Sequence, residues 1–218
     1  MSDFPKLEEV SQPHVVLLGD SLLPVRADLP EGSLEGAVLP GARFPWKLSV
    51  ISAAQIAMPG AAATTIPEDA THIIINIEGN DAIAASGLLE GPAVAWRTGL
   101  ATLSGAADDF ERHVEILARA ALSTRLPTLV CTMYPPRYPD WEQQQAACAA
   151  LAVFNDRILK SAVAAGFAIA DLRQLGSFAE LYASPTQLSV AGLQRVAEVM
   201  RRALDVISRE APRTQVFY

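Results

Sequence analysis

A serine follows a short apolar run near the start of the chain. Val15 to Leu18 predicts a buried strand, and the run stops at Gly19-Asp20-Ser21. Glycine permits a sharp turn there, and Ser21 then stands at the carboxyl end of a strand, where open α/β sheets bind their ligands. The same residues also suit a plain helix start, because Asp20 or Ser21 could cap the helix that follows.

Two later turns repeat this arrangement of polar or glycine-rich residues after a strand. Pro-Gly-Ala at 59–61 follows the predicted strand 48–53, and Gly-Asn-Asp at 79–81 follows the strand 71–77. The carboxyl ends of parallel strands share one edge of a sheet, so the three turns are expected to converge there.

Strands and helices alternate along the chain, which indicates crossover connections and a parallel sheet covered on both faces. The helices are predicted at residues 105–122, 141–165 and 189–209. The strands are predicted at residues 14–18, 48–53, 71–77, 127–133 and 167–172. We therefore expect a three-layer α/β/α sandwich with a flavodoxin-like parallel sheet of about five strands.

The length of 218 residues suits one domain, and a hydrophobic content of 50% with 19% charged residues argues against extended disorder. We expect an acidic lead-in at residues 1–13, a single domain over 14–209 and a short tail over 210–218.

With these motifs in this order, the chain resembles the SGNH (GDSL) hydrolase superfamily over roughly residues 14–205. The blocks of that superfamily are a Gly-Asp-Ser nucleophile, a glycine after the second strand, a Gly-x-Asn-Asp turn and a late Asp-x-x-His. The resemblance implies that Ser21 is the catalytic nucleophile. It also implies that the Ser21 N–H, the Gly60 N–H and the Asn80 amide form an oxyanion hole, where fixed donors stabilise negative charge on an acyl intermediate.

The fourth block departs from the family pattern. Residues 184–192 align with Asp-x-x-His-x-Ser-x-x-Gly, and in this register Ser184 replaces the aspartate and Gln187 replaces the histidine. A glutamine amide is not a usable base at neutral pH, and a serine is a weak nucleophile unless a base takes its proton. The sequence therefore predicts degenerate acid and base positions.

None of the three histidines is expected to replace the missing base. His14 and His72 begin strands whose far ends bear the motifs, which puts them more than about 10 Å from the predicted site. His113 lies beside the apolar stripe of a predicted surface helix.

Three carboxylates flank the predicted site at the same sheet edge. Asp20 and Asp81 are interpreted mainly as groups that hold the turns through backbone N–H bonds, and either one, or Glu78, would be an unusual base if burial raised its pKa.

The composition excludes several classes of partner. A net charge of −7 with no run of Lys or Arg argues against nucleic acid, and no apolar run reaches the roughly 18 residues of a membrane span. The N-terminus lacks an apolar signal core, so a cytoplasmic location is expected. Three histidines and two cysteines without metal-ligand spacing predict neither metal nor cofactor, and the oligomeric state is left open.

Two functions are compatible with this pattern. The first is a non-standard SGNH serine esterase or acyl hydrolase acting on a small ester, acyl or acetylated-sugar ligand. The alternative is a catalytically inactive SGNH-fold module, a pseudoenzyme that binds or regulates.

Overall fold

The structure of the protein is a computed structural model. It describes the following parts of the chain: residues 13–19, 47–52, 56, 66–77, 96–175, 178–208 and 214–218.

In the described parts of the chain, six parallel strands form one sheet, in the order β2-β1-β3-β4-β5-β6. The strands are β1 (His14–Gly19), β2 (Lys47–Ile51), β3 (His72–Asn76), β4 (Thr128–Cys131), β5 (Ala168–Ala170) and β6 (Val216–Phe217). Every residue of β1, β3, β4 and β5 is buried, as expected for apolar, β-branched strands that have helices on both faces.

Three long helices and two short 3-10 helices accompany the described strands. They are α4 (Trp96–Thr124), α5 (Trp141–Ala165), η2 (Leu172–Leu175), η3 (Ala179–Leu181) and α6 (Val190–Ile207). Helix α5 begins where the Asp140 side chain accepts a bond from Gln143 N–H, and it ends at Gly166, which takes the left-handed conformation at φ 71°. Both ends follow the ordinary capping preferences, and the bounds of α5 agree with the helix predicted at 141–165.

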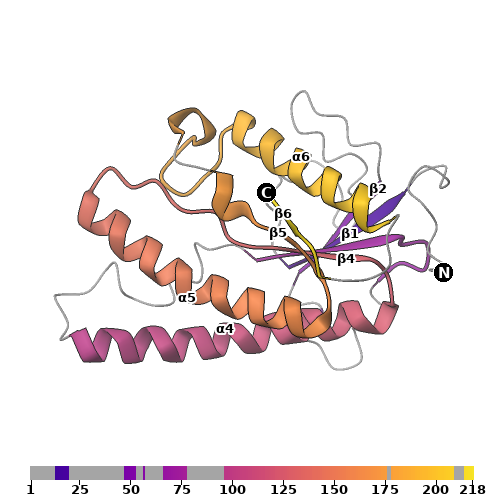
Figure 1. Ribbon diagram of the computed structural model, residues 1–218, viewed down its shortest axis with the longest axis horizontal. Helices are drawn as coiled ribbons and strands as arrows, with labels where there is room; N and C mark the ends of the chain where they lie inside the picture. Colours follow the sequence, from indigo (N-terminus) through magenta and orange to yellow (C-terminus); the bar gives the residue numbers. More distant parts are fainter. Residues whose placement is uncertain are drawn as a thin grey trace.

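The sheet lies between two helical layers, with α4 and α5 on one face and α6 on the other (Figure 1). One hydrophobic core joins the sheet to α4 and α5, and Phe110 and Phe154 meet in it edge to face at 5.2 Å. The second core joins the opposite sheet face to α6 through residues such as Leu17, Leu129 and Val196. The predicted three-layer α/β/α architecture is confirmed.

The sheet has one strand more than the sequence predicted. Residues 216 and 217 were expected to belong to a tail, but they form β6, where Ile169 N–H bonds to Gln215 O at 2.7 Å. A two-residue strand is too short for sequence periodicity to reveal. The predicted helix 105–122 is longer, because α4 begins at Trp96.

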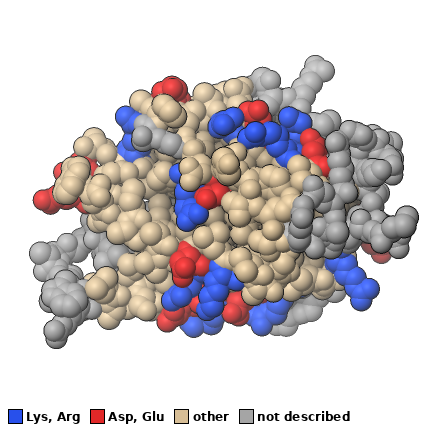
Figure 2. All heavy atoms as spheres, in the orientation of Figure 1, with Lys and Arg blue, Asp and Glu red and all other residues tan. Residues whose placement is uncertain are grey.

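Charged side chains of both signs are interspersed over α4 and α5 (Figure 2). They form ion pairs between the two helices, including Arg157 with Asp108 at 3.2 Å and Lys160 with Glu111 at 2.6 Å. Within the described parts of the chain, no helix is long and apolar enough to cross a membrane.

Candidate functional site at the carboxyl edge of the sheet

The last residue of β1 is a position that only glycine can occupy. Gly19 has φ 110°, and a Cβ added to it would lie 2.1 Å from the backbone oxygen of Asn76, the last residue of β3. Strands β1 and β3 therefore end side by side in close contact at Gly19 and Asn76.

Most of the predicted site residues lie outside the described residues. They are Asp20, Ser21, Gly60, Glu78, Asn80 and Asp81. The described chain reaches Gly19, the first residue of the first motif, and Ile77, which precedes the third, so the roles assigned to these residues remain predictions. Ser184 and Gln187 are described.

The end of β4 is fixed by a buried asparagine of α5. Asn155 accepts a bond from Met133 N–H at 2.8 Å and donates its amide to Met133 O at 3.2 Å. Both backbone polar groups of Met133 are thus satisfied away from water, which holds the segment that leaves β4 in one conformation.

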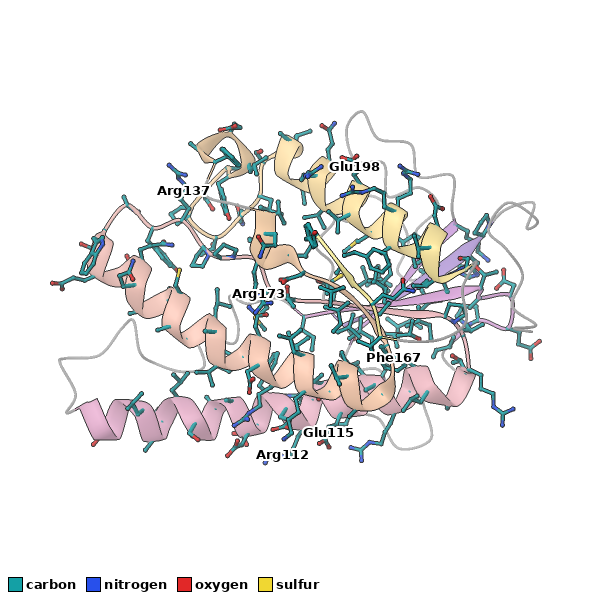
Figure 3. All side chains as sticks on the ribbon, viewed as in Figure 1. Arg112, Glu115, Arg137, Phe167, Arg173 and Glu198 are labelled. Atoms are coloured by element: carbon teal, nitrogen blue, oxygen red, sulfur yellow. The ribbon has the colours of Figure 1, made fainter. Side chains whose placement is uncertain are left out.

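The end of β5 is tied to β4 through polar side chains. Thr132 Oγ1 donates to Asp171 Oδ1 at 3.2 Å and accepts from Leu172 N–H at 2.8 Å. Asp171 also accepts from the Arg173 guanidinium at 2.7 Å through each oxygen (Figure 3). Burial raises the pKa of Asp171, but the bonds from Arg173 outweigh this effect and leave the pKa below its ordinary value. Asp171 is therefore an ionised, structural carboxylate.

Ser184 and Gln187 lie in a tight turn between η3 and α6. Gln187 N–H approaches Ser184 Oγ at 3.2 Å, and Gln187 O accepts from Ala183 N–H at 2.9 Å. The Gln187 side chain is exposed and Ser184 is half-buried. Neither side chain can take a proton at neutral pH.

This turn is attached to the segment that leaves β4, so it lies at the carboxyl edge of the sheet. Arg137 N–H donates to Pro185 O at 2.6 Å, and the Tyr134 hydroxyl donates to Thr186 O at 2.9 Å. Arg137, which precedes the start of α5 at Trp141, is labelled in Figure 3. Tyr134 thus connects the segment after β4 to this turn, while Trp141, at the start of α5, is 72% exposed.

The end of the 184–192 segment has the local geometry that its residue types favour. Ser189 caps α6 by accepting from Gly192 N–H at 3.2 Å. A Cβ at Gly192 would lie 2.2 Å from Leu181 O, so a glycine is needed for the close approach of α6 to η3. The serine and glycine of this block therefore have structural roles.

The histidines lie where the sequence placed them, at the amino ends of their strands. His14 begins β1 and His72 begins β3, at the opposite end of each strand from Gly19 and Asn76. Burial lowers the pKa of His72 to about 4, so its ring is neutral at physiological pH. His113 is exposed on α4.

Sequence reasoning missed the groups that hold the strand ends. Asn155 lies in an alanine-rich helix with no motif around it, and the only available signal was one polar residue on an apolar face. In the described parts of the chain, no three His, Cys, Asp or Glu side chains gather as a metal site requires.

No protein-family model and no curated protein matches the sequence. Solved structures do match the fold. A proposed SGNH hydrolase from Slackia heliotrinireducens superposes with a TM-score of 0.58 at 16% identity, over 88% of this chain and 99% of the other. An extracellular lipase from Streptomyces rimosus superposes with a TM-score of 0.57 at 18% identity, over 88% of this chain and 100% of the other.

The chain has the SGNH hydrolase fold. An acetylxylan esterase, Axe2 from Geobacillus stearothermophilus, also superposes, with a TM-score of 0.52 at 18% identity over 89% of this chain and 94% of the other. The SGNH fold predicted from three short motifs is confirmed, and identities this low establish the fold alone.

Proposed function

We propose that the protein is an SGNH-type serine acyl hydrolase with a non-standard catalytic site. In this proposal Ser21 attacks the carbonyl carbon of an ester. The Ser21 and Gly60 N–H groups and the Asn80 amide stabilise the resulting oxyanion. The proposed base that takes the serine proton is one of three carboxylates, Asp20, Asp81 or Glu78.

The observation that carries the proposal is the conformation of Gly19. A positive φ and a contact with Asn76 O that excludes any side chain are specific requirements at the end of β1. They support a turn after β1 that places the next two residues, Asp20 and Ser21, at the carboxyl edge of the sheet. A plain helix start after a strand does not need this geometry.

The described part of the fourth block supports a site without the usual proton-transfer pair. Gln187 is exposed in its turn, and the Ser184 hydroxyl lies beside Gln187 N–H. Asp171, the carboxylate that follows β5, is already bound by Arg173 and Thr132. The proton of Ser21 must therefore go to another group.

The expected rate is low. In serine hydrolases, loss of a triad member costs up to about 10⁶ in turnover, while binding and oxyanion donors alone retain roughly 10³–10⁴ over water. The small-ester, acyl or acetylated-sugar ligand is proposed from the resemblance and from neighbours that include a lipase and an acetylxylan esterase. A cytoplasmic location and the exclusion of nucleic acid are proposed from sequence composition.

The second candidate function is an inactive SGNH-fold binding module, a pseudoenzyme. The same observation at Ser184 and Gln187 favours it, because neutral donors without a base would hold a carbonyl or carboxylate oxygen without reacting.

Turnover separates the two functions. Purified protein is assayed against p-nitrophenyl esters of increasing chain length and against acetylated sugars. The acyl hydrolase predicts hydrolysis above the buffer rate, most of which is lost in Ser21→Ala and none of which is lost in Ser104→Ala, a serine exposed on α4. Folded protein without Ser21-dependent turnover, but with ligand-dependent thermal stabilisation, would establish the binding module instead.

A further inference from the structure

A second serine of the chain lies at the end of a carboxylate–imidazole–hydroxyl series. Asp69 Oδ1 lies 2.8 Å from His14 Nδ1, and His14 Nε2 lies 2.8 Å from Ser49 Oγ. We call these three residues the amino-edge relay. Two bonds of hydrogen-bonding length thus join a carboxylate to a hydroxyl through one imidazole ring.

Three separate elements bring the relay together. In the register of β1 and β2, Val16 pairs with Ser49 and His14 pairs with Lys47, so His14 and Ser49 point to the same face of the sheet. Asp69 lies in the turn that precedes β3. His14 and Asp69 lie at the amino end of the sheet and Ser49 is the third of the five residues of β2, whereas Gly19 and the predicted Ser21 site belong to the carboxyl end.

The chemistry of the three groups fixes the direction of the bonds. An ionised carboxylate can only accept, so Nδ1 of His14 donates to Asp69. In the neutral ring Nε2 is then the acceptor, and the hydroxyl of Ser49 must donate to it. This is the arrangement in which an imidazole acts as a general base toward a serine.

The surroundings keep the relay ready for this chemistry. Lys47 Nζ lies 2.9 Å from Asp69 Oδ2. Bonds from Lys47 and then His14 lower the pKa of Asp69 to about 2, so it is ionised at neutral pH. The His14 ring is buried and fixed at both nitrogens, while Ser49 is partly exposed on β2.

We propose that Ser49 is a second nucleophilic serine, with His14 as its base and Asp69 as the residue that positions the ring, and that it accepts acyl groups from small activated esters. Ser49 Oγ forms a bond to the carbonyl carbon while its proton passes to His14 Nε2. The ester C–O bond then breaks, and the departing alcohol takes the proton from Nε2. Water, deprotonated by His14, attacks the acyl carbon, and the acid leaves as Ser49 regains its proton.

A fluorophosphonate probe tests this proposal in the Ser21→Ala protein. Ser49 Oγ would displace fluoride from phosphorus and retain the phosphonyl group. Trypsin separates the two serines, since Ser21 falls in the peptide 7–26 and Ser49 in the peptide 48–97. We expect the adduct on Ser49, located by fragmentation of the second peptide, and its loss in Ser21→Ala/Ser49→Ala.

Two variants, one at Asp69 and one at its neighbour Lys47, distinguish activation of the Ser49 hydroxyl from an effect on packing. Asp69→Asn is expected to slow labelling at Ser49 by at least about 100-fold, because the amide no longer imposes the reactive tautomer of His14. Lys47→Gln removes the other partner of Asp69 without touching the ring, and should change the rate less than about threefold. Because this variant loses the tryptic site at residue 47, its Ser49 label is measured on the peptide 44–97. The melting temperature, measured for each variant, confirms that labelling is compared between folded proteins.

A cysteine in place of Ser49 provides an independent measurement. Ser49→Cys should react with iodoacetamide at least about tenfold faster than the native Cys148, because a neighbouring imidazole promotes the thiolate. An unlabelled 48–97 peptide in folded Ser21→Ala protein would overturn the proposal. Equal labelling rates in the Asp69→Asn and parent proteins would overturn it too. Labelling of the 7–26 peptide in wild type reports Ser21 separately.

Discussion

Gly19 shows how one residue type sets the geometry at the end of a strand. Its φ of 110° and the 2.1 Å that would separate an added Cβ from Asn76 O both exclude other residues. Gly19→Ala is expected to lower the free energy of unfolding by about 2–6 kcal/mol, through backbone strain and forced separation of β1 from β3. Urea denaturation measures the change.

Gly105→Ala is the matched control, because Gly105 lies in α4 and a Cβ there meets nothing within 4 Å. It should raise stability by about 0.5–1 kcal/mol, as expected for alanine in an exposed helix. Equal effects of the two substitutions would contradict the special role of Gly19.

His72 makes stability depend on pH. Its ring is fully buried, bonded to Ser208 Oγ at 2.6 Å, and its pKa falls to about 4 from an ordinary 6.5. Between these values the unfolded chain binds more protons than the folded protein, so stability declines as the pH drops from 6.5 to 4, by up to about 3 kcal/mol. Below pH 4 this contribution no longer changes.

Urea midpoints at pH 7, 5.5 and 4.5 test this dependence. His72→Gln should show a shallower decline than wild type, whereas His113→Gln, on an exposed helix position, should retain the wild-type decline. Parallel pH profiles for His72→Gln and wild type would contradict a buried, neutral ring.

Among the elements, the turn between η3 and α6 contains the clearest departure from the family pattern. It is attached to the segment after β4 through Pro185 and Thr186, and it leads into the capped start of α6. Because the backbone of residues 184–192 is held by these contacts, an acid and a base can be introduced there by substitution. Ser184→Asp with Gln187→His is expected to raise esterase activity by at least about 100-fold, as an added base and its partner would.

The single change Gln187→Asn, which keeps an amide, is the control and should leave activity at the wild-type level. A folded double variant without any gain would contradict the register that assigns these two positions to the acid and base.

Strand ends and long helices were predictable from the sequence, whereas the contacts between elements were not. The apolar run of β1, the β-branched β3 and the Gly166 stop of α5 all express local preferences that sequence reasoning uses. The relay of Asp69, His14 and Ser49 depends on the register of β1 against β2, which no local pattern specifies. Of the candidate site, Ser184 and Gln187 are the positions whose surroundings the structure describes.

At the scale of the whole molecule, β6 closes the described sheet beyond β5. Asp171 N–H donates to Phe217 O at 2.6 Å, and Phe217 packs partly buried against the α6 side of the core. Ending the chain at residue 213 removes these backbone bonds and this contact. We expect a loss of about 2–4 kcal/mol in the free energy of unfolding.

Tyr218→Ala is the control for this truncation, since the Tyr218 side chain is 74% exposed and its removal should change stability by less than about 0.5 kcal/mol. An unchanged urea midpoint for the truncated chain would contradict the assignment of β6 to the sheet.

Fluorophosphonate labelling of the wild-type protein tests the central claim most directly, because the probe reports an activated serine without knowledge of the substrate. The account predicts an adduct on Ser21, in the tryptic peptide 7–26, that disappears in Ser21→Ala while the melting temperature is maintained. The absence of any adduct on that peptide in folded wild-type protein would contradict an acyl hydrolase that uses Ser21, and would leave the SGNH fold as a binding module at its carboxyl edge.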